Sequence, residues 1–432
     1  MHGTSQRTAS ALLLALSAAL CAPAAAGDIG RFRITGSSGN QANGDVLDPA
    51  VSDSALVLAY STNARNLGID HGTGAAQIFV QDALTDAIDI VSRGVGGEFS
   101  NGNCYQPSLS ADARFVAFIC NGTNLVAGEA PGVFAVYRRD RQSGLTQRVS
   151  NGIGAVINGQ ARYPTLSADG RYVAYYSAAS IQIPGDTNGF SDLLLTDMQT
   201  GASERLSVSA TGAQSPQGAI EHWMPALSAD ARFAVFASAS TNLVPSPSVG
   251  SIQVYLRDRQ LGSTQLLSVN AQGQAASSQT DSPSISANGR YVVYRSFATN
   301  LVAGATSGVY RLDRSIGSLL ALPTPPNAFN CSLPTVSSRG DVSYLCSDSG
   351  NGLRQAWLFQ PPSGLFMLSE SVTAAASNGS VETQHALGAN GSLMAFASTA
   401  TDIVSGDTNG ETDTFVAVDV GRLSGLFADG FE

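Results

Sequence analysis

A short alternation of polar and apolar residues recurs along the chain. Its clearest copy, residues 164–175, reads PTLSADGRYVAY: a polar strand start, a Ser-Ala-Asp-Gly turn and a mainly apolar run. Successive copies start 51 to 61 residues apart. Self-similarity at this period is typical of stacked or radially arranged supersecondary units, and not of separate domains. The seven copies begin at Pro49, Pro107, Pro164, Pro225, Pro283, Pro334 and His385.

Each repeat is predicted to form four strands. Strand A holds the Pro-x-Leu-Ser segment and ends at a turn such as 168–170. Strand B is apolar on both sides of its alternation, as in 115–119, which is expected of a strand buried on two faces. Strand C precedes a second turn, as in 254–262, and strand D follows, as in 204–207. Four antiparallel strands in seven copies predict an all-β fold, the seven-bladed β-propeller.

The two ends of the array predict how the ring closes. The last repeat contains strands A, B and C, the third at 414–418, followed by a short tail. Residues 31–35 (RFRIT) align with strand D of the other repeats. We therefore expect this N-terminal strand to complete the last blade, which removes two open sheet edges. A linear β-solenoid is the alternative, but its rungs are shorter than about 50 residues.

Composition agrees with many short strands joined by turns. The 432 residues are 43% apolar and include 45 Gly and 17 Pro, which argues against a helical or disordered protein. The formal net charge is −10, and all 23 basic residues are arginine. No basic stripe exists to neutralise phosphates, so the sequence argues against nucleic acid as a partner.

The first 26 residues resemble a secretory signal peptide. Arg7 supplies the positive start, 11–20 the apolar core, and the alanines at 24–26 a small-residue cleavage site. The apolar run is too short to cross a bilayer, and no later run reaches the roughly 18 residues needed. We therefore expect an exported monomer, periplasmic or extracellular, with the propeller at 27–421 and a C-terminal tail at 422–432.

Four cysteines remain after the predicted cleavage, and their positions predict two disulfides. Cys104 and Cys120 lie symmetrically about a turn centred on Asp112, so they face each other in the A–B hairpin. Cys331 and Cys346 flank a turn one residue shorter and face each other likewise. Directly opposed Cβ atoms stand about 4.5–5.5 Å apart, near enough for a disulfide after modest adjustment. Two pairs of free buried thiols are the alternative.

The motif at 167–175, Ser-Ala-Asp-Gly-Arg-Tyr-Val-Ala-Tyr, resembles the repeat of TolB-like, PD40 (WD40-like) bacterial propellers. Their signature is Ser-Pro-Asp-Gly-Lys-x-Ile-Ala-Phe. The resemblance covers essentially the whole mature chain, although Ala replaces the usual Pro and the copies at 49 and 334 are eroded. The family contains periplasmic partner-binding proteins, noncatalytic propellers on peptidases and many exported proteins of other kinds. The resemblance therefore implies the architecture more than the function.

Two loops between strands B and C share an Asp-x-Asn-Gly-x-x-Asp pattern. It places three oxygen-bearing side chains around a tight glycine turn, as Ca²⁺ requires. An Asx turn, with the carboxylates bonded to their own backbone amides, is the alternative. Neither loop has the bidentate Glu that completes an EF-hand loop. The candidate calcium ligands are Asp186, Asn188 and Asp192 in one loop and Asp407, Asn409 and Asp413 in the other.

The B–C loops and the D–A connections are expected on one face of the ring, because successive strands alternate in direction. The longest insertion on this face, 214–224, contains an acid, a His and a Trp that could grip a sugar or peptide. A Trp that fills the funnel wall beside two solvated neighbours is the alternative. The candidate ligand-binding residues are Glu221, His222, Trp223, Tyr105, Arg162 and Tyr163.

The sequence favours binding over catalysis. It contains no Gly-x-Ser-x-Gly elbow, no His-Glu-x-x-His pair and no Walker-type loop, and it has no lysine. We therefore expect a noncatalytic propeller that binds a protein, peptide or glycan through its loop face, with Ca²⁺ as the one candidate cofactor. Two alternatives are a propeller glycosidase or polysaccharide lyase, with Glu221 and His222 as acid and base, and a passive envelope component.

Overall fold

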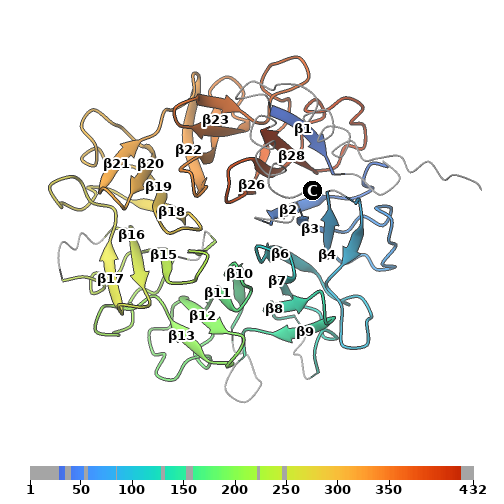
Figure 1. Cartoon of the computed structure of the whole chain (residues 1–432), viewed down its shortest axis with the longest axis horizontal. Coiled ribbons are helices and arrows are strands. Elements are labelled where there is room, and N and C mark those ends of the chain that lie inside the picture. Colours follow the sequence, from blue (N-terminus) through green and yellow to red (C-terminus); the bar gives the residue numbers. More distant parts are fainter. Residues whose placement is uncertain are drawn as a thin grey trace, which may run out of the picture.

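The computed structural model describes residues 29–34, 40–52, 57–83, 85–127, 132–151, 159–220, 224–245 and 251–419. Within these ranges the chain forms β-strands and no helix. The strands make seven four-stranded antiparallel sheets, arranged as blades around a central axis (Figure 1). The predicted seven-bladed propeller is confirmed. The described chain has no helix that could cross a membrane.

Six blades each consist of four consecutive strands, ordered from the channel outwards. The strands of these blades are β2 (Val46–Val51), β3 (Val57–Thr62), β4 (Gln77–Asp82) and β5 (Ile88–Ile90); β6 (Cys104–Leu109), β7 (Phe115–Cys120), β8 (Ala135–Asp140) and β9 (Leu145–Arg148); β10 (Ala161–Leu166), β11 (Tyr172–Ser177), β12 (Asp192–Asp197) and β13 (Ser203–Arg205); β14 (Ala226–Leu227), β15 (Phe233–Ser238), β16 (Gln253–Asp258) and β17 (Ser263–Leu266); β18 (Thr280–Ile285), β19 (Tyr291–Ser296), β20 (Gly308–Asp313) and β21 (Ser318–Ala321); β22 (Ala328–Val336), β23 (Val342–Asp348), β24 (Arg354–Gln360) and β25 (Gly364–Met367).

The seventh blade joins the two ends of the chain. Its strands, from the channel outwards, are β26 (Val381–Leu387), β27 (Leu393–Ser398), β28 (Asp413–Asp419) and β1 (Ile29–Arg33). β1 pairs with β28 in antiparallel register along its whole length. The predicted closure of the ring by the N-terminal strand is confirmed.

Buried side chains hold neighbouring blades together. Seven hydrophobic clusters lie one at each interface between adjacent blades. Within five blades an aromatic side chain of strand B stacks on one of strand C, as Phe118 does on Tyr137 with ring centroids 5.9 Å apart. Strand B is therefore apolar on both faces, as its sequence predicts, because each face packs against a different neighbour.

The recurring motif residues stabilise the A–B turn. Ser167 donates its hydroxyl hydrogen to Asp169 at 2.6 Å and accepts the backbone N–H of Tyr172 at 2.9 Å. Arg171 makes a two-pronged ion pair with Asp197 at the end of strand C. Its guanidinium lies 4.8 Å from the centre of the Tyr172 ring. The turn therefore accounts for the recurrence of Ser, Asp, Arg and an aromatic residue at fixed spacing.

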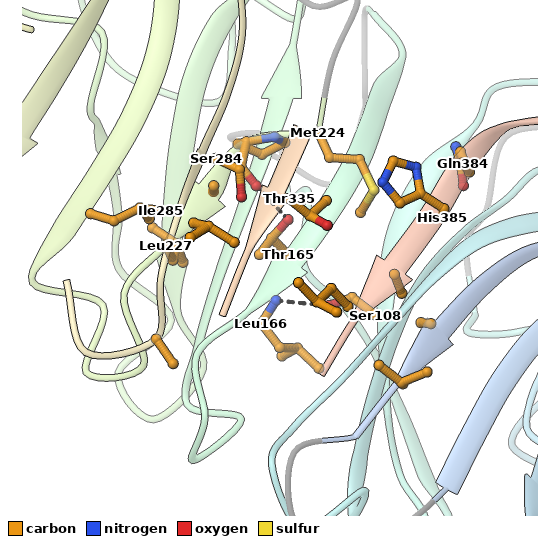
Figure 2. A pocket seen from close by; sticks show the side chains of 18 of the residues that line it. Ser108, Thr165, Leu166, Met224, Leu227, Ser284, Ile285, Thr335, Gln384 and His385 are labelled. Atoms are coloured by element: carbon orange, nitrogen blue, oxygen red, sulfur yellow. Dashed lines mark hydrogen bonds between the residues drawn. The ribbon is translucent and has the colours of Figure 1, made fainter. Parts of the chain in front are cut away.

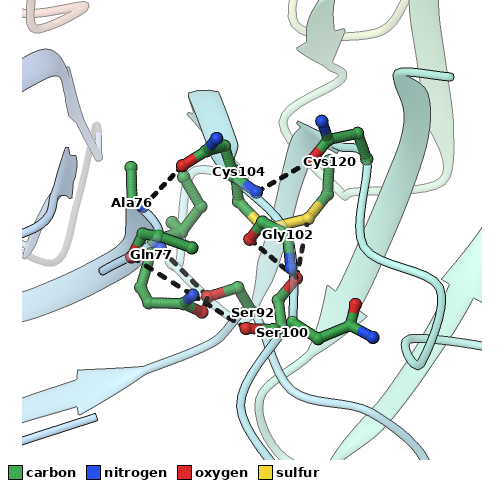
Figure 3. The surroundings of a disulfide bond; sticks show 12 residues. Ala76, Gln77, Ser92, Ser100, Gly102, Cys104 and Cys120 are labelled. Carbon is green, nitrogen blue, oxygen red and sulfur yellow. Dashed lines mark hydrogen bonds between the residues drawn. A yellow bond between two sulfur atoms is a disulfide. The ribbon is translucent and has the colours of Figure 1, made fainter. Parts of the chain in front are cut away.

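Both predicted disulfides are present. Cys104 and Cys120 are direct partners in the β6–β7 register, with Cα atoms 4.1 Å apart (Figure 3). Cys331 and Cys346 join β22 to β23 with Cα atoms 4.0 Å apart. Each bridge therefore links the innermost strand of a blade to its neighbour. The predicted signal peptide at 1–26 and the tail at 422–432 lie outside the described residues.

Candidate functional site in the central channel

The inner strands of all seven blades enclose a central channel with a volume of ≈ 670 Å³ (Figure 2). The residue after the proline position of each repeat is small, and the next one is a branched aliphatic residue. The small residues are half-buried and line the channel, whereas the aliphatic residues also pack into the clusters between blades. The small residues are Ala50, Ser108, Thr165, Ala226, Ser284, Thr335 and Ala386, and the aliphatic ones are Val51, Leu109, Leu166, Leu227, Ile285, Val336 and Leu387.

The part of the channel wall that the structure describes is electrically neutral. The described residues that line it include no Asp, Glu, Lys or Arg, and their one basic side chain is His385. These described residues supply neither a pair of carboxyl groups of the kind that acts in glycoside hydrolysis nor a cation for a polyanionic substrate. It suits an uncharged or apolar guest.

Two hydroxyl groups in the wall make hydrogen bonds within the protein. Ser108 accepts the backbone N–H of Leu166 in the next blade at 3.1 Å (Figure 2). Thr165 donates to the carbonyl of Pro225, again in the next blade, at 2.7 Å. These hydroxyls therefore link the inner strands of neighbouring blades by hydrogen bonds.

Backbone hydrogen bonds between blades surround the A–B turn end of the channel. Ala111 N–H donates to the carbonyl of Ala168, and Ala168 N–H donates to that of Ala229, both at 2.9 Å. Ala229 N–H continues the series to Ala287 at 2.7 Å. Backbone hydrogen bonds therefore connect neighbouring blades at this end of the channel. They hold the inner strands at a fixed separation there.

A backbone irregularity marks the loop-bearing end of the channel. Five inner strands carry a register shift where the chain reaches its proline. The residue before that proline has a positive φ of 52° to 56°, a region that non-glycine residues rarely adopt. Such bulges free backbone groups from the sheet and are common at the rims of barrels and beside binding sites. These residues are Asp48, Gln106, Tyr163, Ser282 and Leu333.

The bulges of neighbouring blades bond to one another. The Asp48 carboxylate accepts the backbone N–H of Gln106 at 3.1 Å, and the Gln106 side-chain oxygen accepts that of Tyr163 at 2.9 Å. Burial raises the pKa of Asp48, although Gln106 and the Ser61 hydroxyl partly offset this effect. Burial also raises the pKa of Tyr105, and the charge of Asp48 adds to it. The rim is therefore held in one arrangement by polar contacts between blades.

The sequence-predicted ligand-binding residues fall in different places. Tyr163 lines the channel. Tyr105 packs against Phe134, with ring centroids 6.1 Å apart, and Arg162 is exposed with its Nε 3.0 Å from the Gln160 side-chain oxygen. Of these three described candidates, the structure brings only Tyr163 into the channel wall. The other three, Glu221, His222 and Trp223, lie outside the described residues.

Sequence reasoning missed His385 as a candidate site residue. It occupies the proline position of the seventh repeat, where the other six copies have proline. This single departure from the repeat was the signal available in the sequence. In the structure, His385 lines the channel, and its ring and the side chain of Met224 point toward one another (Figure 2).

The first candidate calcium loop is organised around an arginine. Arg205 of β13 lies between two carboxylates, with Nη2 3.3 Å from Asp186 Oδ1 and Nε 2.9 Å from Asp192 Oδ2. The side-chain amide of Asn188 donates to Asp192 at 3.2 Å and to the carbonyl of Ser215 at 2.9 Å. Burial raises the pKa of Asp192, while its hydrogen bond from Ser207 and the charge of Arg205 oppose that rise.

The second loop repeats this arrangement at the ring closure. Arg33 Nη1 lies 3.0 Å from Asp407 and 3.7 Å from Asp413. The amide of Asn409 donates to Asp413 at 3.2 Å. Burial and the neighbouring Asp407 raise the pKa of Asp413 to about 6. Among the described residues no three His, Cys, Asp or Glu side chains form a metal-binding group, and calcium binding by these loops stays a prediction.

Comparison with other blades shows which side chain usually occupies the position of Asp192 and Asp413. In the first blade, the position equivalent to Asp192 and Asp413 is Gln77, whose side-chain oxygen accepts the Ser92 hydroxyl at 2.7 Å. The same Gln–Ser hydrogen bond recurs in the fourth and sixth blades. Where Asp replaces Gln, the negative charge is matched by an arginine from the outermost strand of the same blade.

The sequence matches no protein-family model and no curated protein. Oligogalacturonate lyase from Vibrio parahaemolyticus has a similar structure, with 12% identity and a TM-score of 0.56 over 91% of this chain and 98% of the lyase. The β-propeller domain of the Trilobed protease from Pyrococcus furiosus, described as an open velcro topology, is 11% identical with a TM-score of 0.51, over 86% of this chain and 95% of that domain.

TolB from Acinetobacter baumannii is also similar, at 19% identity and a TM-score of 0.44 over 73% of this chain. The match spans 64% of that TolB chain. At these identities the structural matches show the propeller fold alone. The structure confirms the propeller architecture that the resemblance of the repeat motif to TolB-like propellers implies.

Proposed function

We propose that this protein is an exported, noncatalytic propeller that binds an uncharged segment of a partner in its central channel, entered from the loop-bearing face. The observation that carries this proposal is the neutral wall, whose described residues include no carboxylate, lysine or arginine. The protein has a net charge of −10, yet the described residues of its central cavity carry no acidic, lysine or arginine side chain, which suits an uncharged guest.

The shape and rigidity of the channel support binding. Its volume of ≈ 670 Å³ lies within the range of about 300–1,000 Å³ that is typical of ligand sites. Hydrogen bonds between blades fix both of its ends. A preformed site loses little conformational entropy when it is occupied, so modest apolar contacts can yield useful affinity.

Two disulfides support export, since such bonds persist in oxidising compartments. The partner classes that the sequence suggests are a protein, a peptide or a glycan. The structural similarity to a lyase makes catalysis the alternative to test, with Glu221 and His222 as the acid and base candidates.

The proposal is tested by filling the channel. Ala226 is half-buried in the wall, so Ala226→Trp places a large side chain in the lumen. Leu261, 71% exposed at a C–D turn, provides the matched control Leu261→Trp. A displayed random peptide library and an array of neutral and acidic oligosaccharides are screened against the wild-type protein, and the Kd of each hit is measured by calorimetry.

We expect hits whose binding is lost in Ala226→Trp and kept in Leu261→Trp. Hits that bind both variants equally, or a screen without any hit, would overturn the proposal. Turnover of an oligosaccharide that disappears in Glu221→Gln would instead establish the enzyme alternative.

A further inference from the structure

His385 is a half-buried side chain whose two ring nitrogens are buried. The backbone carbonyl of Ser343 lies close enough to interact with one of them, and the other has no hydrogen-bond partner. Among the described residues that line the channel, His385 is the one with a buried side-chain nitrogen that lacks a partner. A buried polar group without a partner costs stability, and such groups are rare enough in native proteins to call for an explanation.

Proline would avoid this cost. Six repeats place proline at the same position, and it presents no polar side chain to the channel. The wall hydroxyls of Ser108 and Thr165 are used in contacts between blades. The seventh repeat therefore gives the channel an imidazole with one nitrogen that the protein itself does not use.

The ring is neutral at physiological pH. Burial lowers the pKa of His385 to about 4, and the nearby backbone carbonyl of Ser343 offsets only part of that effect. A neutral imidazole has one N–H donor and one lone-pair acceptor. The Ser343 carbonyl favours the N–H on the nitrogen nearest to it, which leaves the other nitrogen as an acceptor.

Met224 is the side chain toward which the His385 ring points (Figure 2). Its thioether chain has three rotatable bonds and adapts easily to a guest. Movement of Met224 would uncover the ring for a group that enters the channel.

We propose that His385 determines which guest the channel accepts, because its unprotonated nitrogen takes a hydrogen bond from an amide or hydroxyl side chain of a neutral peptide segment. This inference rests on the proposed function and names the guest of the same site. The side chain would be that of Asn, Gln, Ser or Thr.

The wall favours a peptide over a glycan. Sugars are commonly bound by stacking on aromatic rings, whereas the described lining contains one aromatic side chain apart from His385, that of Tyr163. Proline, methionine and branched aliphatic residues make up much of the rest. Such a surface complements aliphatic peptide side chains, with the imidazole to recognise one polar group among them.

The test uses a peptide selected for channel-dependent binding, as described above. Its Kd is measured by calorimetry with the wild type, with His385→Phe, which keeps a planar ring but removes the acceptor, and with His385→Leu as a second variant. His71→Gln is the matched control, because the His71 ring is bonded to Thr73 and Ala64 in a loop of the first blade that does not line the channel. Thermal unfolding of every variant is recorded beside the titrations.

We expect His385→Phe and His385→Leu to raise Kd about tenfold, while His71→Gln leaves it unchanged. Replacing the donor residue of the peptide by Leu should weaken binding to the wild type equally but cause no further loss with His385→Phe. The melting temperature of His385→Phe should stay the same or rise, because an orphaned polar group is removed. A purely structural role would instead lower it without affecting Kd.

Equal affinity of the His385 variants, or additive losses in the double-mutant cycle, would overturn this inference while leaving channel binding intact. His385-dependent binding of an oligosaccharide but not of the peptide would also overturn it. If the proposed function itself failed, the result would differ: no peptide would bind the wild type more tightly than it binds Ala226→Trp.

Discussion

Arg33 of the N-terminal strand lies 3.0 Å from Asp407 of the loop between β27 and β28, across the seam where the ring closes. Arg205 and Asp186 stand in the same relationship within the third blade, 3.3 Å apart. The second pair joins neighbouring strands of one continuous chain segment. The first pair joins the two ends of the propeller, so the same kind of Arg–Asp ion pair also stabilises the closure of the ring.

Removal of the arginine at the seam should destabilise the protein strongly. Arg33→Gln leaves Asp407 and Asp413 buried without their cation, which we expect to lower the free energy of unfolding by about 3 kcal/mol. Urea denaturation followed by tryptophan fluorescence measures the change. Arg65→Gln is the control, because Arg65 and Asp70 form an exposed pair whose loss should be undetectable. Equal effects of the two substitutions would show that the Arg33 ion pairs do not stabilise the closure of the ring.

Through Asp413, acidification should raise the free energy of unfolding. The pKa of Asp413 is about 6 in the folded protein, against the ordinary value of 3.8. Between these two values the folded state binds a proton that the unfolded chain does not, so stability rises as the pH falls from about 7 to 4. His385 acts in the opposite direction, because its folded pKa of about 4 lies below the ordinary 6.5.

The contributions of Asp413 and His385 to the pH dependence of stability are separated with the variant Asp413→Asn. Melting temperatures of the wild type and of Asp413→Asn are compared from pH 7 to pH 4.5. We expect the wild type to gain stability relative to the variant across this range, by on the order of 2–3 kcal/mol at the acidic end. A constant difference between the two proteins would mean that Asp413 titrates normally.

Chelation tests the calcium prediction directly. Arg33 and Arg205 lie between the carboxylates that would bind the ion, so each loop has its charge partly neutralised without a metal. We therefore expect the same melting temperature with EDTA and with millimolar Ca²⁺. A fall with EDTA that Ca²⁺ reverses would establish a stabilising calcium site and would require these arginines to move aside.

The repeat predicts much of this fold because each recurring residue makes a specific local contact. The Ser167 and Asp169 side chains shape the A–B turn, and Arg171 joins it to strand C. Even the ring closure follows from counting strands, since the N-terminal segment, predicted at 31–35 and observed as β1 at 29–33, supplies the strand that the last repeat lacks. Local rules repeated seven times leave little room for another topology.

The candidate site was harder to predict because it forms only when the ring closes. Ala226 and His385 are distant in sequence and unremarkable alone, yet both line one channel. The sequence emphasised residues with evident chemistry, of which Tyr105 on β6 and Arg162 on β10 do not line the channel. The contact of Asp413 with Arg33 was also missed, because Arg33 comes from the other end of the chain and reaches this loop only when the ring closes.

The disulfides should stabilise the inner wall to similar extents. They close loops of 16 and 15 residues, so the chain-entropy model assigns each about 3 kcal/mol. We expect Cys104→Ser/Cys120→Ser and Cys331→Ser/Cys346→Ser to lower the unfolding free energy by similar amounts in urea. Reductant should lower the melting temperature of the wild type and leave that of the quadruple variant unchanged. Two double variants as stable as the wild type would contradict the prediction. A loss confined to one pair would place the stabilisation in the packing of that blade, because the entropy of loop closure is nearly equal for the two.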